Sequence, residues 1–294
     1  MNKLPVISSV SEVLSGVIRH YFQLIHVAWP AILLLVLAFG GITWVYLSSG
    51  VLDLAFGEQD PEKVRAVTER LGSPGSIAAF VAGGLVAIVA SAVAAVRWHR
   101  FVLLGEGADG RLSQIRLLRG EDGSYIWTSI RVILAYTLVV LAFAALFMLA
   151  GMLLRMLAGE AGAVHGIGSA IIALGGIALY FVALTVMFRL MIALPDAALG
   201  RGGRLFEMFD KTKGNSWRLF GAFLLLLLIA GTATVIGSII VGLLGALGIA
   251  GALIGGVLYI GIYLFSLMVQ ITMLSVAYRE IIGVSGEQEA PAAV

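Results

Sequence analysis

Few residues in this sequence have the types and spacing that a catalytic or metal site needs. The four histidines are dispersed, with no H-E-x-x-H motif and no pair of carboxylates beside a histidine. No serine lies in a G-x-S-x-G motif, and the chain contains no cysteine. Because no nucleophile, general base or ligand set is evident, we expect a protein that is not an enzyme and that holds no cofactor and no metal.

Three glycines, Gly105, Gly107 and Gly110, have the spacing G-x-G-x-x-G in the segment GEGADG. A dinucleotide-binding loop with this spacing follows a β-strand and opens a helix inside a βαβ unit. Here a long apolar stretch of transmembrane type precedes the glycines, and no βαβ pattern occurs along the chain. The spacing therefore predicts a flexible turn and not a nucleotide site.

A basic and aromatic cluster, Arg97, Trp98, His99 and Arg100, ends the second apolar stretch. Such cations can bind lipid phosphates, and an indole ring is typical of the membrane interface. Ordinary anchoring of the chain at the interface would explain the same residues. We favour anchoring over a specific site for a lipid head group.

Arg189 and Gln270 are strongly polar side chains within apolar stretches. The Arg189 guanidinium can reach the interface, or it can pair in the interior with Asp196, a loop carboxylate or a lipid phosphate. An amide such as Gln270 more often joins two helices by a hydrogen bond than lines a pathway. No Asp or Glu lies within any of the apolar stretches, which argues against an ion-coupled pump.

The composition of the chain predicts the kind of secondary structure that must position these residues. Of 294 residues, 60% are hydrophobic and only 12% are charged, whereas about a quarter of a soluble chain is charged. This composition excludes a soluble enzyme, a nucleic-acid binder and a disordered chain, and it predicts an all-α, polytopic membrane protein. Six stretches reach the length of about 20 residues that a transmembrane helix needs. They are residues 28–48, 76–96, 130–154, 167–194, 219–245 and 252–278.

We expect one integral membrane domain over residues 1–294. Apolar residues recur with helical spacing over residues 1–26, which predicts an amphipathic helix that lies in the membrane interface. The six-span bundle then covers residues 27–278, and residues 279–294 form a polar tail.

The basic residues predict the orientation of the chain. If both termini are inside, most of the 19 Lys and Arg residues fall on the cytoplasmic side. The exceptions are Lys63, Arg65, Arg70 and Arg155. We therefore expect a multi-pass protein of the bacterial inner membrane with cytoplasmic termini. Its amphipathic loop segments in 97–129 and 196–217 should then meet the anionic inner leaflet.

Two further patterns concern how the spans are grouped. An amphipathic segment leads three times through a tryptophan, Trp29, Trp127 or Trp217, into a pair of apolar stretches. We interpret this as three units of interfacial helix plus hairpin, although tryptophan is common at any membrane interface. Gly251 and Gly255 have the spacing G-x-x-x-G, which indicates close helix packing either within the chain or in a homo-oligomer.

One stretch resembles a pattern in bacterial inner-membrane proteins that have no assigned activity: RLMIALPDAALGRGGRLFEMFDKTKGNSWRLF, residues 189–220. That group includes the YciC-type proteins and the membrane domain beside some glycerophosphodiester phosphodiesterases. The shared elements are R-x-x-x-x-x-P and T-x-G-N-x-W-x-L, and the segment RWHRFVLLGE at 97–106 is also similar. The matching residues are Arg189, Pro195, Thr212, Gly214, Asn215, Trp217 and Leu219. The resemblance implies paired hydrophobic hairpins. It implies no particular activity, because the group itself has none assigned. The phosphodiesterase activity is not carried over, since that domain is absent from this sequence.

Three functions remain open at this point. We favour a non-enzymatic protein that acts through lipid or protein contacts at the cytoplasmic face, and the alternative is a transporter or permease-like protein for a small or lipidic substrate. A lipid-modifying enzyme that uses Asp196, Asp210 and His99 comes third. The partners we expect are lipids of the anionic inner leaflet, with a second copy or another membrane protein as further candidates, and no nucleic acid. The residues expected to contact lipid or a partner are Arg97, Trp98, His99, Arg100, Arg189, Asp196, Asn215, Trp217 and Arg218, with Gln270 as an intramembrane polar contact.

Overall fold

The computed structural model describes residues 3–51, 54, 60–109, 118–158 and 162–284. Helices are the only regular elements within these ranges. They are α1 (Val6–His20), α2 (Gln23–Ser48), α4 (Pro61–Leu71), α5 (Pro74–Leu104), α6 (Gly120–Ala158), α7 (Gly162–Met191), α8 (Ala193–Ala198), α9 (Leu205–Lys211), α10 (Ser216–Gly245) and α11 (Ile249–Ile281). Among the described residues, six helical segments are long and apolar enough to cross a membrane, so the predicted all-α, six-span fold is confirmed.

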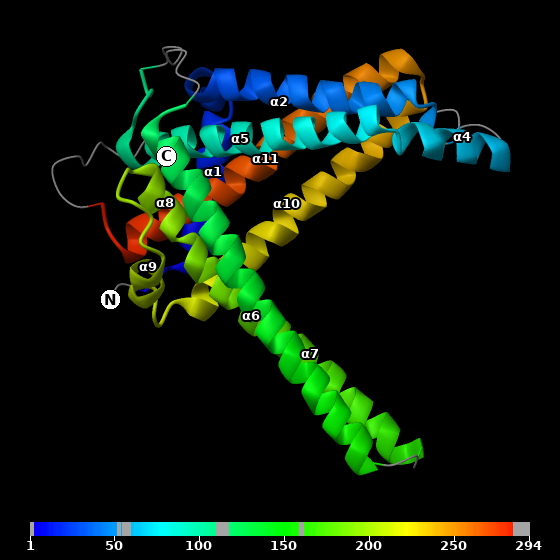
Figure 1. Cartoon of the computed structure of the whole chain (residues 1–294). Coiled ribbons are helices and arrows are strands. Elements are labelled where there is room, and N and C mark those ends of the chain that lie inside the picture. The colour runs from blue at the N-terminus through cyan, green and yellow to red at the C-terminus, as the bar shows by residue number, and fades with distance from the viewer. Residues whose placement is uncertain (1–2, 52–53, 55–59, 110–117, 159–161, 285–294) are drawn as a thin grey trace.

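The six long helices pack as three pairs, α2 with α5, α6 with α7, and α10 with α11 (Figure 1). The pairs coincide with the three hairpins expected from the sequence, while an internal repeat stays a prediction. All three pairs meet at the end of the molecule that carries α8 and α9. From there the α6–α7 pair points away from the other spans, so the bundle opens toward its far end (Figure 1).

At the end where the helix pairs meet, the spans α5 and α6 extend beyond the bounds predicted from the sequence. Helix α5 continues to Leu104, and Gly105 ends it in the left-handed conformation with φ +68°. Helix α6 begins at Gly120. Residues 97–104 and 120–129, which we expected in a loop, are therefore helical, because their polar side chains find partners on neighbouring helices. The amphipathic segment expected between them falls largely outside the described residues.

Helix α1 packs against α10 and α11. Val10, Val13 and Val17 of its apolar face are buried there, so these side chains contact protein where we expected them to meet lipid. The Tyr21 hydroxyl donates a 2.8 Å hydrogen bond to the Gly261 carbonyl of α11. The amphipathic pattern predicted a helix correctly, and this helix uses part of its apolar face to join the bundle. Ile7 and Ile18 are 80% and 68% exposed, and their place in the membrane interface stays a prediction.

Glycines allow α10 and α11 to approach each other closely. A Cβ atom at Gly251 would lie 1.9 Å from the carbonyl oxygen of Leu244, and one at Gly255 would lie 3.3 Å from that of Val241. The face formed by Gly251 and Gly255 is therefore occupied by α10 of the same hairpin. Of the two alternatives that the spacing left open, this is packing within the chain and not in a homo-oligomer.

Candidate functional site

A buried polar layer joins α5 to α11 where the helix pairs meet. Trp98 is 1% exposed, and its indole Nε1 donates a 2.7 Å hydrogen bond to the hydroxyl of Thr272. The fully buried His99 has its Nδ1 2.7 Å from the hydroxyl of Ser275. Thr272 and Ser275 are three residues apart and so share one face of α11. We expected Trp98 and His99 at the lipid interface, and the structure corrects this by placing them in the interior. Hydroxyls there pair with the Trp98 Nε1 and the His99 Nδ1, whereas the His99 Nε2 is buried without a hydrogen-bond partner among the described residues.

The two arginines of the same cluster turn toward carboxylates of neighbouring segments. The Arg97 guanidinium lies 3.5 Å from the Asp122 carboxylate of α6, and both side chains are nearly inaccessible. Arg100 donates from Nε to Glu106 over 2.8 Å and lies 3.7 Å from Glu121. Neither arginine presents its charge freely to a lipid phosphate, and the hydrogen bond from Arg100 lowers the pKa of Glu106.

Asp196, the only acidic residue of α8, is fully buried. One carboxylate oxygen accepts a 3.0 Å hydrogen bond from the Tyr278 hydroxyl of α11, and the other accepts a 3.4 Å bond from the backbone N–H of Arg204. The Arg201 guanidinium donates in turn to the Tyr278 oxygen over 3.2 Å. The Tyr278 hydroxyl therefore donates to the acidic Asp196 and accepts from the basic Arg201 at the centre of this layer.

Arg189 does not pair with Asp196. Its guanidinium donates to the Thr212 hydroxyl over 3.1 Å and to the Phe209 carbonyl, and it stacks 3.6 Å above the Phe209 ring. These contacts fasten the end of α7 to α9 and its C-cap. Arg189 therefore turns toward the polar end of the bundle, as the interface alternative predicted, but its partners are protein groups.

The motif near the start of α10 holds the N-terminal segment. The Asn215 amide oxygen accepts a 2.9 Å hydrogen bond from the backbone N–H of Leu4, and Arg218 donates over 3.0 Å to the carbonyl of Leu4. Leu4 itself is fully buried. Trp217, between these two residues, is 65% exposed, and its contact with lipid stays a prediction.

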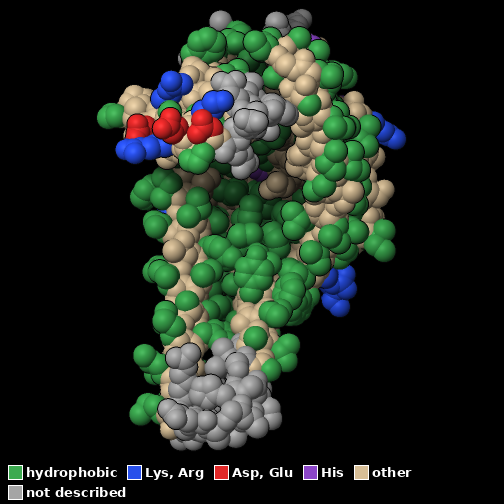
Figure 2. Space-filling model, turned by 90° about the vertical axis from the view of Figure 1, so that its right-hand side faces the viewer, with side chains coloured by type: hydrophobic (Ala, Val, Ile, Leu, Met, Phe, Trp, Pro, Cys, Tyr) green, Lys and Arg blue, Asp and Glu red, His purple; other side chains and the backbone are tan. Residues whose placement is uncertain are grey.

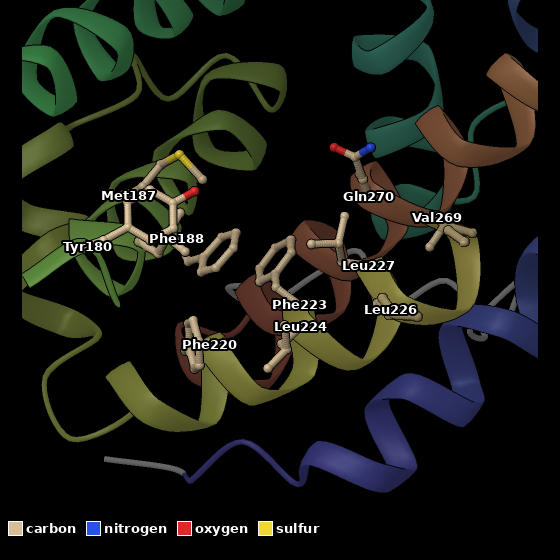
Figure 3. A pocket seen from close by; sticks show the side chains of 12 residues that line it. Tyr180, Met187, Phe188, Phe220, Phe223, Leu224, Leu226, Leu227, Val269 and Gln270 are labelled. Atoms are coloured by element: carbon tan, nitrogen blue, oxygen red, sulfur yellow. The ribbon is translucent and has the colours of Figure 1, made fainter. Parts of the chain in front are cut away.

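A pocket of about 250 Å³ lies between α7, α10 and α11 (Figure 3). Its walls are mostly aromatic and aliphatic, with Phe188 and Phe223 stacked at 4.3 Å between ring centroids. Tyr180 and Gln270 are the lining residues with polar side-chain groups. We expected Gln270 to join two helices, but no hydrogen bond links its amide to the residues that the structure describes.

The surface between the helices is strongly apolar. Figure 2 shows hydrophobic side chains over most of one face and inside its central hollow, whereas the acidic side chains seen there gather at its upper end. Within the described ranges, no three His, Asp or Glu side chains come close enough to hold a metal ion. The arrangement can thus hold apolar chains. Among the buried polar atoms of the layer, the His99 Nε2 and the Asp122 Oδ1 have no hydrogen-bond partner within the described residues.

The sequence interpretation missed Asp122, Thr272, Ser275 and Tyr278. The last three recur at every third position of α11, and this polar stripe on an otherwise apolar helix was an available signal. Asp122 gave no such signal, because its partner Arg97 lies on another helix.

Comparisons with family models, with curated proteins and with solved structures found no match to this chain. The fold and the site define a class: a multi-pass helical membrane protein with a buried polar layer at one end and an apolar pocket between its spans.

Proposed function

We propose that this chain is a non-enzymatic integral protein of the bacterial inner membrane that acts through lipid contacts at its cytoplasmic face. The orientation rests on the excess of basic residues on that side. The resemblance of residues 189–220 to YciC-type proteins supports the same membrane. The observation that carries the proposal is an exposed aromatic face near the buried polar layer.

We use the name aromatic face for three exposed side chains, Phe206, Trp127 and Trp217, which are 79%, 58% and 65% exposed. They come from α9, α6 and the first turn of α10, near the polar end of the bundle. Large exposed aromatic side chains are costly in water and favourable at the level of lipid head groups. This supports partial insertion of the aromatic face into the cytoplasmic leaflet.

Electrostatics contributes less to this contact than the aromatic rings. The basic side chains of α9 and its C-terminal flank are paired with nearby acids: Lys211 lies 2.8 Å from Glu207, and Lys213 lies 2.8 Å from Asp210. Hydrogen bonds from these lysines lower the pKa of both acids, so both carboxylates stay charged near neutral pH. We therefore propose a modest preference for anionic lipid and a stronger dependence on the aromatic side chains.

Burial of the candidate acids and bases supports a protein that is not an enzyme. His99 and Asp196, two of the residues that a lipid-modifying reaction would need, are both 0% exposed. The His99 Nδ1 faces Ser275 and one Asp196 oxygen faces Tyr278, while the His99 Nε2 is itself buried. A general acid or base must reach the substrate by direct contact or through one water molecule, which this packing does not favour.

Native mass spectrometry of the full-length chain from nanodiscs of mixed phosphatidylglycerol and phosphatidylcholine tests the proposal. We expect retained lipid, and we expect less of it with the double variant Phe206→Ser and Trp217→Ser. Trp44→Ser is the matched control, because Trp44 is 70% exposed near the C-terminal end of α2, away from the aromatic face. Equal lipid retention by the double variant and the wild type would exclude the aromatic face as the contact.

A transporter or permease-like protein for a lipidic substrate is the second candidate. One observation favours it: the spans leave a pocket between α7 and the α10–α11 hairpin, and this pocket contains Gln270.

A further inference from the structure

Gln270 carries an amide that no described residue of the chain satisfies. Its side chain is exposed on α11, and no hydrogen bond joins it to the described residues. The helix places it about 13 Å along the axis from Arg279, on the apolar side of the polar layer. An amide at that depth is costly when it faces only hydrocarbon. A group from outside the chain is therefore needed to pair with it.

The walls of the pocket restrict what that group can belong to. None of the lining residues is charged, and charge is expensive at this depth in a membrane. The volume of about 250 Å³ is below the range of about 300–1,000 Å³ that is typical of sites for compact ligands. A neutral amphiphile meets the first restriction, and a pocket of this volume takes the part of its apolar chain that lies next to the hydrogen-bonding group.

Aromatic rings connect this pocket to the membrane interface. The Trp217 ring packs edge to face on Phe220, with 5.8 Å between centroids, and Phe220 lines the pocket. Phe188 and Phe223 continue the lining beyond it, and the view in Figure 3 shows Gln270 on the opposite side from Tyr180. A chain that enters between α7 and α10 can thus stay in contact with apolar side chains until its polar group reaches Gln270.

We propose that the pocket between α7, α10 and α11 binds a neutral long-chain amphiphile, of the fatty alcohol or acylglycerol class, whose hydroxyl or carbonyl group pairs with the Gln270 amide. This site adjoins the aromatic face at Trp217 but lies between the spans, and its test uses variants that leave the aromatic face unchanged. A helix from a second copy and an unselected bilayer lipid are the competing occupants.

The test uses the full-length chain in nanodiscs with three probes of equal chain length: hexadecanol, palmitate and hexadecane. Native mass spectrometry after transfer to detergent counts the bound probe. We expect hexadecanol to bind more tightly than palmitate or hexadecane. Gln270→Leu should weaken hexadecanol binding about three- to tenfold while hexadecane binding is unchanged.

A matched pair of variants separates the pocket from the general surface. Leu227 lines the pocket and Leu228 does not, and the two side chains are 63% and 60% exposed on the same helix. We expect Leu227→Trp to abolish hexadecanol binding and Leu228→Trp to leave it intact. Equal binding of all three probes would assign the pocket to unselected lipid. A dimer that only Leu227→Trp dissociates would assign it to a second copy. Either result would overturn the proposal.

Discussion

The Tyr278 hydroxyl donates a 3.0 Å hydrogen bond to the Asp196 carboxylate and so joins the last span, α11, to the short helix α8. Both side chains are almost inaccessible to solvent. A buried carboxylate is tolerated only when donors satisfy its oxygens, and here a phenol and a backbone N–H do so. This pair therefore couples the end of the bundle to the segment that precedes α9.

Tyr278→Phe should lower the stability of the protein because it leaves one oxygen of a buried carboxylate without its donor. We expect a loss of about 1–3 kcal/mol, measured as a fall in the thermal unfolding temperature in detergent. Tyr259→Phe is the control, since Tyr259 lies on the same helix and is 45% exposed. Equal unfolding temperatures for the two variants would show that the Asp196 contact does not contribute to stability.

Gly251→Ala should disrupt the α10–α11 hairpin, because the new Cβ would lie 1.9 Å from the backbone oxygen of Leu244, which cannot rotate away. Overpacking of this kind costs about 1–3 kcal/mol. Gly256→Ala is the matched control, since a Cβ there meets nothing within 4 Å. Thermal unfolding in detergent measures both, and a Gly251→Ala protein as stable as the control would contradict the close helix contact.

The number of spans could be predicted from the sequence because each is a long apolar run, and hydrocarbon accepts only helices whose backbone is satisfied internally. The residues at which the spans end could not be predicted in this way. Arg97 and His99 indicate an interface by residue type alone, yet their partners Asp122 and Ser275 lie on other helices. Pairing of this kind is a property of the packed bundle and leaves no local pattern.

The candidate site was predicted only in part for the same reason. Gln270 stood out as an isolated amide in an apolar helix, and the structure adds that it lines a pocket. Asn215 was recognised through a resemblance and Arg218 occupies an unspecified position of the same motif, but their contact with the backbone of Leu4 joins residues more than two hundred positions apart. No spacing rule predicts a hydrogen bond to a distant backbone group.

Asn215→Ala should loosen the N-terminal segment, because the backbone N–H of Leu4 would lose its acceptor. We expect hydrogen exchange of the peptide containing Leu4 to become about tenfold faster, as for a hydrogen bond worth about 1.4 kcal/mol. Exchange followed by mass spectrometry measures this. Lys213→Ala, an exposed change shortly before Asn215 in the chain, is the control and should leave the exchange rate unchanged. An unchanged rate for Asn215→Ala would mean that this hydrogen bond does not hold the N-terminal segment.

Glu106 should make the stability of the polar layer depend on pH. The hydrogen bond from Arg100 lowers the pKa of Glu106 in the folded protein, whereas an unfolded glutamate titrates near pH 4.3. A lowered pKa gives stability that is fully present above the pKa of the unfolded chain and is lost as the pH falls through the folded value. Glu106→Gln should therefore unfold at a lower temperature than the wild type at pH 7, with the difference shrinking steadily below about pH 4.3.

The control for this pH dependence is Glu69→Gln on α4, where the ion pair with Arg65 is fully solvated, with side chains 66% and 83% exposed. Solvent screening leaves such a pair with little effect on stability, so the unfolding temperature of this variant should follow the wild type at every pH. The Arg100 side chain is only 15% exposed, and removal of its acidic partner leaves a charge that water reaches poorly. A difference between wild type and Glu106→Gln that stays constant from pH 7 to below pH 4 would show that the two residues contribute through packing and not through charge.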